Sequence, residues 1–336
     1  MTVREKLENN EHLVLSDKAC FADCSKGRLI DEEKDNLRTD FQRDRDRIIH
    51  SNSFRRLKHK TQVFLSPLGD HYRTRLTHTL EVSQIARTVA NALGLNQDLT
   101  EAISLGHDLG HTPFGHAGER ALNSLMPNGF RHYEQSLRVI DKLEKTGRGL
   151  NLTYEVRDGI LCHTKGKEAD TLEGQIVKVA DKIAYINHDI DDAIRGDIMT
   201  EEDIPLTIRL ALGQNKSERI NTLVTDLVQN SKDSISFSEE INKPFYELHG
   251  LMFGLVYTNP KCKGEETKAI DIIIRLFEYY MDHPDALPAF YKEIAEDEGI
   301  ERGICDYISG MSDRYLLNLF NNLFIPNSWA DMELRW

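Results

Sequence analysis

Residues 107–119 bring an unusual number of reactive side chains into one short stretch. Three histidines and two carboxylates lie there between small residues: His107, Asp108, His111, His116 and Glu119. The adjacent imidazole and carboxylate at its start offer the nitrogen and oxygen donors that divalent metal ions bind. The last histidine and the glutamate are three residues apart, so on a helix the carboxylate can orient the ring and raise its basicity. The stretch therefore predicts metal ligands beside a general acid/base pair.

Two more side chains of the same types lie far away in the sequence. His78 falls on an apolar helical stripe, where a histidine is more often a core residue than a ligand. Asp181 lies among apolar residues, where an ionised carboxylate needs a partner, and a neighbouring lysine would be the simplest one. Together with His107 and Asp108, however, they offer two nitrogen and two oxygen ligands. Such a set suits Mn²⁺, Mg²⁺, Fe²⁺ or Co²⁺, with Zn²⁺ as a further candidate, and leaves coordination positions for water.

Helices are the elements that must position these residues. Apolar residues at helical spacing predict helices over residues 73–93, 99–109, 151–163 and 171–195. Pro113 and Gly115 break the helical pattern, and a new helix is expected near His116. The pattern stays helical from residue 202 to the end, and no alternating strand runs stand out. The sequence therefore predicts an all-α protein.

We expect three parts along the chain that form one continuous structural unit. Residues 1–40 are polar and weakly periodic, which indicates an N-terminal arm on the surface. Residues 41–230 would form a catalytic helical core, and residues 231–336 a C-terminal helical part packed on it, with a loop at 231–244. Residues 41–60 are expected to be helical and are strongly basic. By default such a run is a solvated helix face, although it stands out in an acidic chain.

The composition limits the class of protein. The 336 residues are 40% hydrophobic and 29% charged, as in a globular chain. A formal net charge of −13 argues against indiscriminate nucleic-acid binding, because neutralising phosphates needs basic surface. No apolar run has the length of a membrane span, and the N-terminus lacks the apolar region of a signal peptide, so we expect a cytoplasmic protein without a membrane partner. The five scattered cysteines fit reduced thiols.

The order of the predicted metal ligands, H…HD…D, is the pattern of the HD superfamily of metal-dependent phosphohydrolases. Within that superfamily the chain resembles the deoxynucleoside triphosphate triphosphohydrolases, or dGTPase-like proteins. An HD doublet alone would be weak evidence, but the resemblance covers roughly residues 28–326. It is carried by RDRIIH at 45–50, FRRL at 54–57, KTQVF at 60–64, RLTH at 75–78, residues 107–119, HYEQS at 132–136, ADKIAY at 180–185 and residues 305–315.

The resemblance implies an HD-domain helical bundle with additional C-terminal helices, and it implies roles for individual residues. The implied metal ligands are His78, His107, Asp108 and Asp181. The implied catalytic residues are the acid/base pair His116 and Glu119, and His111, which with His132 would line the phosphate site. The triphosphate would be held by Arg75 and Lys182. The deoxyribose would contact Gln62, Tyr185 and Asp189, with Val63 packed nearby.

The implied reaction is metal-dependent hydrolysis of deoxynucleoside triphosphates, dGTP among them, to a deoxynucleoside and tripolyphosphate, which would control the dNTP pool. Water would attack the α-phosphorus while the metal ion polarises a phosphoryl oxygen. His116 would move a proton, and the sequence leaves open whether it acts as the base or as the acid. Tight packing against the sugar would exclude a 2′-hydroxyl and so reject ribonucleotides.

Two other functions fit parts of the same pattern. An HD phosphohydrolase of another type, such as a 5′-nucleotidase acting on deoxynucleoside monophosphates, would keep the metal ligands but would not need the cationic set of Arg75, Lys182 and His111. A regulator that binds nucleotides or single-stranded DNA would not need His116 with Glu119. The resemblance also implies a homo-oligomer, a tetramer or hexamer, with a nucleotide or single-stranded DNA as a candidate effector.

Overall fold

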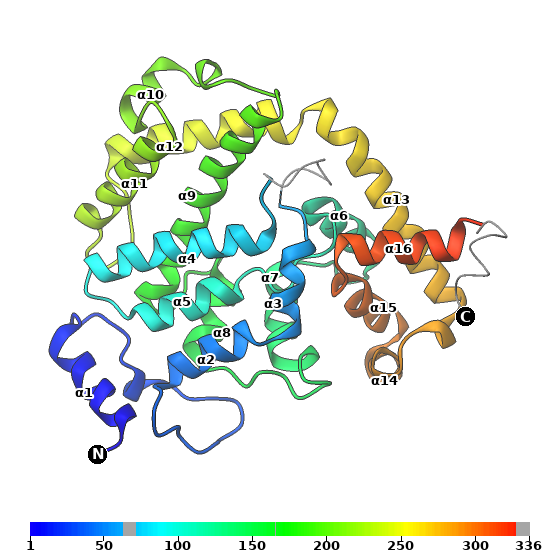
Figure 1. Cartoon of the computed structure of the whole chain (residues 1–336), viewed down its shortest axis with the longest axis horizontal. Coiled ribbons are helices and arrows are strands. Elements are labelled where there is room, and N and C mark those ends of the chain that lie inside the picture. Colours follow the sequence, from blue (N-terminus) through cyan, green and yellow to red (C-terminus); the bar gives the residue numbers. More distant parts are fainter. Residues whose placement is uncertain (63–71, 165, 327–336) are drawn as a thin grey trace, which may run out of the picture.

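The computed structural model describes residues 1–62, 72–164 and 166–326. Within these residues the chain forms sixteen α-helices and no β-strand (Figure 1), which confirms the all-α prediction. The helices of the first half are α1 (Val3–Val14), α2 (Asp40–Ile49), α3 (Asn52–Arg56), α4 (Arg75–Ala92), α5 (Gln97–Gly106), α6 (Gly115–Leu125), α7 (His132–Arg138) and α8 (Tyr154–Cys162). Those of the second half are α9 (Leu172–Arg195), α10 (Leu206–Leu212), α11 (Lys216–Asn230), α12 (Glu239–Met252), α13 (Pro260–Asp282), α14 (Ala289–Glu298), α15 (Ile300–Ser309) and α16 (Asp313–Phe324).

The larger of two apolar clusters lies between the long helices at the centre of the bundle. Helix α4 packs against α5 and α9, and α5 also packs against α2 and α8. The apolar stripe that the periodicity of α4 predicts is buried there, at Val82, Ile85 and Val89. Burial of such a stripe, rather than helix propensity, supplies most of the stability of helices of this kind.

Side-chain caps fix where two of the central helices begin. Thr74 accepts a hydrogen bond from the backbone N–H three residues later at the start of α4, and Thr171 does the same at the start of α9. Each cap satisfies a backbone donor that the first helical turn leaves without a partner. The caps thereby set the register of the helices that carry His78 and Asp181.

The second apolar cluster joins α6 to the C-terminal helices. Ala117 and Leu122 of α6 pack among buried side chains of α13, α15 and α16, including Ile273 and Phe277 of α13. In Figure 1, α13–α16 lie on the right of the larger bundle. The helix that carries the predicted acid/base pair therefore shares its core with the C-terminal helices rather than with the helices of the metal ligands.

Residues 41–60 are mostly helical, as the sequence predicts, and are divided between α2, α3 and a short 3₁₀ turn. The chain turns between α2 and α3, where the side chain of Ser51 accepts a hydrogen bond from the backbone N–H of Phe54. A serine in this position starts a new helix, because its hydroxyl replaces the missing partner of the first turn. Helix α3 then passes into a short 3₁₀ turn at Leu57–His59.

The loop expected at residues 231–244 is shorter than predicted. Ser238 caps α12, so the irregular segment ends at residue 238. The helix then continues through Pro244, although proline removes one backbone hydrogen bond.

The N-terminal residues are held to the body more firmly than their polar sequence predicts. After α1, Ala19 and Ala22 are buried in the larger apolar cluster. The guanidinium of Arg28 donates hydrogen bonds to the buried carboxylate of Asp44 and, at 2.6 Å, to the carbonyl oxygen of Asn151. Apolar burial and a buried ion pair therefore fix part of the predicted surface arm.

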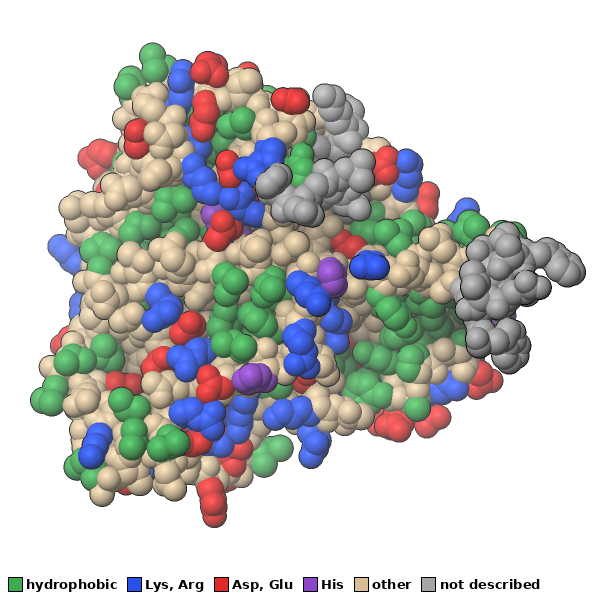
Figure 2. Space-filling model, in the orientation of Figure 1, with side chains coloured by type: hydrophobic (Ala, Val, Ile, Leu, Met, Phe, Trp, Pro, Cys, Tyr) green, Lys and Arg blue, Asp and Glu red, His purple; other side chains and the backbone are tan. Residues whose placement is uncertain are grey.

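Figure 2 shows Lys and Arg side chains gathered over α2 and α3. The arginines of α2 have acidic partners: Arg43 and Arg47 lie 3.3 and 2.6 Å from Glu32, and Arg45 lies 3.0 Å from Asp98. These arginines, expected by default to form a solvated helix face, are half-buried and ion-paired. Among the described helices, none has both the length and the apolar composition needed to cross a bilayer.

Gly110 lies where the segment after α5 passes the backbone of α7. A Cβ atom there would lie 2.1 Å from the backbone nitrogen of Ser136 and 2.4 Å from the carbonyl oxygen of His132. We expect Gly110→Ala to lower the free energy of unfolding by about 3 kcal/mol, because backbone atoms cannot move aside cheaply. Urea unfolding would measure this.

The matched control is Gly250→Ala on α12, where nothing lies within 4 Å of the Cβ position. This helical alanine should leave stability unchanged or raise it by up to about 1 kcal/mol. Equal stability of Gly110→Ala and the unaltered protein would contradict the close approach of α7.

Candidate functional site

The candidate site is built around His107, directly after α5. Nδ1 of its ring lies 2.6 Å from the carbonyl oxygen of Ser104. This contact places the ring proton on Nδ1 and leaves the lone pair on Nε2. Nε2 is buried and has no hydrogen-bond partner among the described residues. A buried lone pair of this kind needs a ligand, and a metal ion is one that would satisfy it.

The four predicted metal ligands come together around that nitrogen. Nε2 of His107 lies 3.4 Å from Oδ1 of Asp108 and 3.8 Å from Oδ1 of Asp181. Nε2 of His78 lies 3.0 Å from the same oxygen of Asp181. Two ligands that are each about 2.1 Å from one ion lie roughly 3.0–3.5 Å apart in octahedral or tetrahedral geometry. The donor atoms of His78, His107 and Asp108 all lie within 4.8 Å of one another, as the ligands of one divalent ion would. Asp181 adjoins this group through its contacts with His78 and His107.

Asp108 has a partner at each of its oxygens. Nη1 of Arg75 donates a hydrogen bond to Oδ2 at 2.9 Å, and Nδ1 of His111 lies 2.8 Å from Oδ1. Burial acts to raise the pKa of this carboxyl, but His111, His107 and Arg75 outweigh it and hold the pKa well below its usual value. Asp108 is therefore a carboxylate, as a metal ligand must be.

His111 is the member of the predicted cationic set whose charge is opposed by burial. Burial lowers the pKa of its ring well below the usual value, and the nearby charge of Arg75 lowers it further. Its contact with Asp108 acts in the opposite direction. Arg75 and Lys182 are the other two members of the predicted set. Nζ of Lys182 lies 5.8 Å from the ring centre of Tyr246 on α12.

Glu119 links two histidines of the predicted site. One of its oxygens lies 3.2 Å from Nδ1 of His116, and the other lies 3.0 Å from Nδ1 of His132. Burial acts to raise the pKa of Glu119, but hydrogen bonds from the two histidines outweigh it and lower the pKa. The ring of His132 stacks on His111 with 3.9 Å between centres, whereas the side chain of His116 is 70% exposed. The acid/base pair thus lies at the solvent side of the site.

The residues expected at the sugar lie on two separate segments. Tyr185 and Asp189 follow Asp181 by one and two turns of α9, as their spacing predicts. Gln62 lies in the segment before α4, and its Oε1 is buried without a hydrogen-bond partner among the described residues. Val63 lies outside the described residues.

Asp189 has a partner that the sequence did not reveal. The hydroxyl of Tyr257, in the short π-helical turn Phe253–Tyr257, donates a hydrogen bond to Oδ2 of Asp189. Burial raises the pKa of Asp189 to about 7, although this hydrogen bond acts in the opposite direction. Oδ1 of the same carboxyl is buried without a hydrogen-bond partner among the described residues.

Two further histidines of the site were missed in the sequence. His163, which ends α8, has ring-centre distances of 5.0 Å to His107 and 5.4 Å to His132. His188 lies 6.4 Å from His78. Its position seven residues after Asp181, on the same face of α9, was a signal that could have revealed it. His163 left no comparable signal, because the contact joins separate helices.

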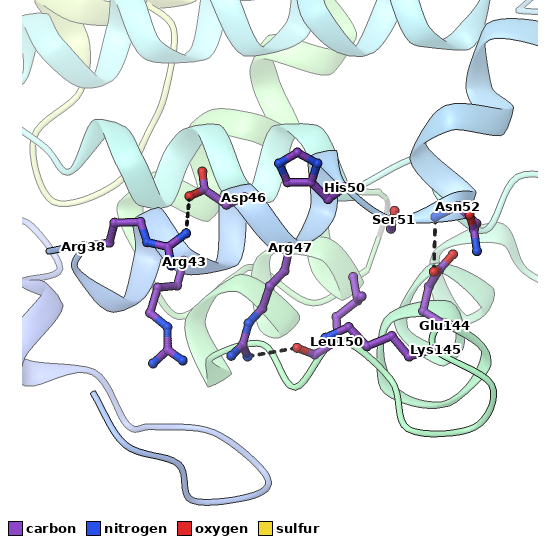
Figure 3. A pocket seen from close by; sticks show the side chains of 10 residues that line it. All are labelled: Arg38, Arg43, Asp46, Arg47, His50, Ser51, Asn52, Glu144, Lys145 and Leu150. Atoms are coloured by element: carbon purple, nitrogen blue, oxygen red, sulfur yellow. Dashed lines mark hydrogen bonds and ion pairs between the residues drawn. The ribbon is translucent and has the colours of Figure 1, made fainter. Parts of the chain in front are cut away.

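The cavity drawn in Figure 3 lies apart from these histidines. Its volume is about 360 Å³, and it is lined by Arg38, Arg43, Asp46, Arg47, His50, Ser51, Asn52, Glu144, Lys145 and Leu150. Figure 3 shows the guanidinium of Arg47 at the carbonyl oxygen of Leu150, a hydrogen bond of 3.0 Å. None of the predicted site residues that the structure describes lines this cavity. The buried histidine group, not this cavity, therefore locates the candidate active site.

Comparison with known proteins identifies the family of this chain. The HD domain model matches residues 75–186, and the phosphohydrolase-associated domain model matches residues 235–322. The chain is 55% identical to the deoxyguanosinetriphosphate triphosphohydrolase-like protein of Caldanaerobacter subterraneus subsp. tengcongensis over 99% of each chain. It is 50% identical to the protein of that name in Clostridium tetani over 97% of each chain. This chain belongs to the dGTPase-like family of HD-domain phosphohydrolases.

Membership in the dGTPase-like family confirms the resemblance found in the sequence. The HD match contains all four predicted metal ligands. A solved phosphohydrolase of Bacteroides thetaiotaomicron is similar in fold, with a TM-score of 0.52, 18% identity and coverage of 88% of this chain and 71% of that one. At this identity the likeness concerns the fold alone.

Replacing one predicted oxygen ligand should weaken metal binding. We expect Asp181→Asn to weaken the binding of Mn²⁺ by at least about 10²-fold, because a neutral amide replaces a carboxylate in the ligand group. Calorimetric titration of the metal-free protein would measure it. Asp191→Asn is the control on the same helix, since Asp191 pairs with Arg73 instead. Equal affinities of the two variants would contradict the ligand assignment.

Proposed function

We propose that this dGTPase-like protein is a metal-dependent triphosphohydrolase that converts deoxynucleoside triphosphates, dGTP among them, to a deoxynucleoside and tripolyphosphate. The observation that carries the proposal is the continuity of the site. Asp108 joins the metal-ligand group to His111, whose ring stacks on His132, the partner of Glu119. A candidate metal centre and an acid/base pair thus lie in one network, as a hydrolase requires. The names of the relatives support the substrate class.

A divalent ion would be held by His78, His107, Asp108 and Asp181. When bound, such an ion acts as a Lewis acid toward a phosphoryl oxygen and lowers the pKa of a coordinated water. Arg75, fixed by its bond to Asp108, would place positive charge beside the phosphates. Lys182, on the next position of α9 after Asp181, would add a second charge. Such fixed charges stabilise the charge that develops at phosphorus in the transition state.

His116 would transfer the proton. The carboxylate of Glu119 accepts a hydrogen bond from Nδ1 of His116, which leaves Nε2 as the nitrogen that exchanges a proton with water or substrate. Glu119 also fixes His132, whose backbone N–H donates to it at 2.9 Å. Glu119 would therefore orient two rings of the site at once.

Two buried oxygens support a subsite for the sugar. Oε1 of Gln62 and Oδ1 of Asp189 have no hydrogen-bond partner among the described residues. A buried acceptor without a partner is costly, and a hydroxyl group of a bound deoxyribose would satisfy it. Tyr185, one turn before Asp189 on α9, would pack against the sugar ring.

Product analysis of the metal-loaded protein with each of the four dNTPs and with GTP tests the proposal. We expect deoxynucleoside and tripolyphosphate in equal amounts, separated by anion-exchange chromatography, and far slower turnover of GTP because the sugar subsite would exclude a 2′-hydroxyl. Monophosphate with pyrophosphate would contradict the proposed reaction. Activity on deoxynucleoside monophosphates alone would favour a 5′-nucleotidase, and comparable turnover of GTP and dGTP would refute the steric exclusion.

Replacing His116 separates proton transfer from metal binding. We expect His116→Ala to keep the metal content of the unaltered protein and to lower kcat by about 10² to 10⁴, the usual contribution of a general acid or base. Steady-state kinetics with dGTP and elemental analysis would measure the two quantities. Ser124→Ala, an exposed position on the same helix, is the control. Near-normal turnover of His116→Ala would rule out its assigned role.

A further inference from the structure

Two buried charged residues lie where the C-terminal helices meet the candidate site. Lys60 is 2% exposed. Its ammonium group donates hydrogen bonds to the carbonyl oxygen of His111 and, at 2.9 Å, to that of Ser309 at the end of α15. The backbone carbonyl of Lys60 accepts a hydrogen bond from the N–H of Arg75 at 3.0 Å. One buried lysine therefore connects the segment after α5, the start of α4 and the end of α15.

Asp313, the first residue of α16, makes the second connection. Oδ1 accepts a hydrogen bond from the backbone N–H of Phe114 at 2.9 Å. Oδ2 accepts one from the backbone N–H of Thr61 at 2.9 Å and another from the hydroxyl of the same residue. All three donors belong to segments that flank the candidate site. The N-terminus of α16 also favours a negative charge at this position.

The hydrogen bond between Phe114 and Asp313 affects the position of α6. It directly precedes α6 and has a φ of 60°, a left-handed conformation that a bulky residue adopts only when its surroundings enforce it. No side chain caps the start of α6. The phenyl ring is buried in the second apolar cluster. The bond to Asp313 and the buried ring together fix the direction in which α6 leaves, and hence the place of His116 and Glu119.

We propose that Lys60 and Asp313 form a clamp through which the C-terminal helices position the catalytic segments. Asp313 would act as a positioning residue: it sets residues 61–62, which lead to the sugar subsite, and Phe114, which leads to α6. The inference rests on the proposed function for its effect on turnover. Its structural part does not depend on that function.

The clamp and the metal-ligand group are separable. Within the described residues, Asp313 makes no hydrogen bond to His78, His107, Asp108 or Asp181. The helices of these ligands pack in the larger cluster, whereas α16 belongs to the second. Loss of the clamp should therefore lower turnover and leave metal binding intact.

The decisive variant is Asp313→Asn, because an amide nitrogen cannot accept the hydrogen bonds that the carboxylate oxygens accept. We expect kcat for dGTP to fall by about 10²-fold, the effect of displacing a reacting group by about 1 Å. KM should rise as well, since residues 61–62 are released together with α6. Bound metal per chain should not change. Hydrogen–deuterium exchange should accelerate in peptides that contain Thr61 and Phe114, relative to the same peptides of the control Arg314→Gln, which alters the exposed neighbour.

A second variant, Thr61→Val, removes only the hydroxyl donor and keeps the shape of the side chain. A smaller change in the same direction supports the clamp even where Asp313→Asn fails to fold. Unchanged exchange at both peptides, or a parallel loss of metal and of thermal stability in Thr61→Val, would overturn the proposal. If the unaltered protein hydrolyses no dNTP, the proposed function fails, and the exchange measurement, which needs no substrate, still decides the clamp.

Discussion

The buried charge of Asp108 is the constraint on which the site depends. Its side chain is 3% exposed, and an ionised carboxylate is stable at such a depth only with partners on both oxygens. Arg75 of α4 and His111 of the following segment supply them. Removal of one partner from a buried ion pair lowers the free energy of unfolding by about 3–5 kcal/mol. This cost holds α4 and the segment after α5 in fixed relative positions. The same restraint keeps His78 and His107 close together.

Two cores contribute to one active site. The predicted metal ligands lie on, or directly after, helices of the larger cluster, and the predicted acid/base pair lies on α6, which packs with the C-terminal helices. Their relative placement must be accurate to a fraction of an ångström for hydrolysis. Apolar packing alone determines such a placement poorly, because it is not directional. The directional hydrogen bonds that Lys60 donates and Asp313 accepts supply what packing lacks, which explains why polar side chains are buried at this junction.

The sequence revealed the parts of this protein whose determinants are local or follow a fixed motif order. Helical spacing predicted the all-α fold and placed Tyr185 and Asp189 on the face of Asp181, and the motif order predicted the family. It failed where contacts join distant segments. The hydroxyl of Tyr257 reaches Asp189 across 68 positions of the chain, and His163 joins the site from another helix. Periodicity within one helix contains no information about such contacts.

The difference in exposure between two histidines bears on which of them transfers the proton. A group that gives or takes a proton in each turnover must return to its starting state through water or product. His111 is 5% exposed, and its burial and the nearby Arg75 and His132 lower the pKa of its ring, although Asp108 acts in the opposite direction. His116 is 70% exposed and has Glu119 at Nδ1 to stabilise a charged ring. This difference supports the proposal that His116 transfers the proton, with His111 in contact with Asp108 and stacked on the ring of His132.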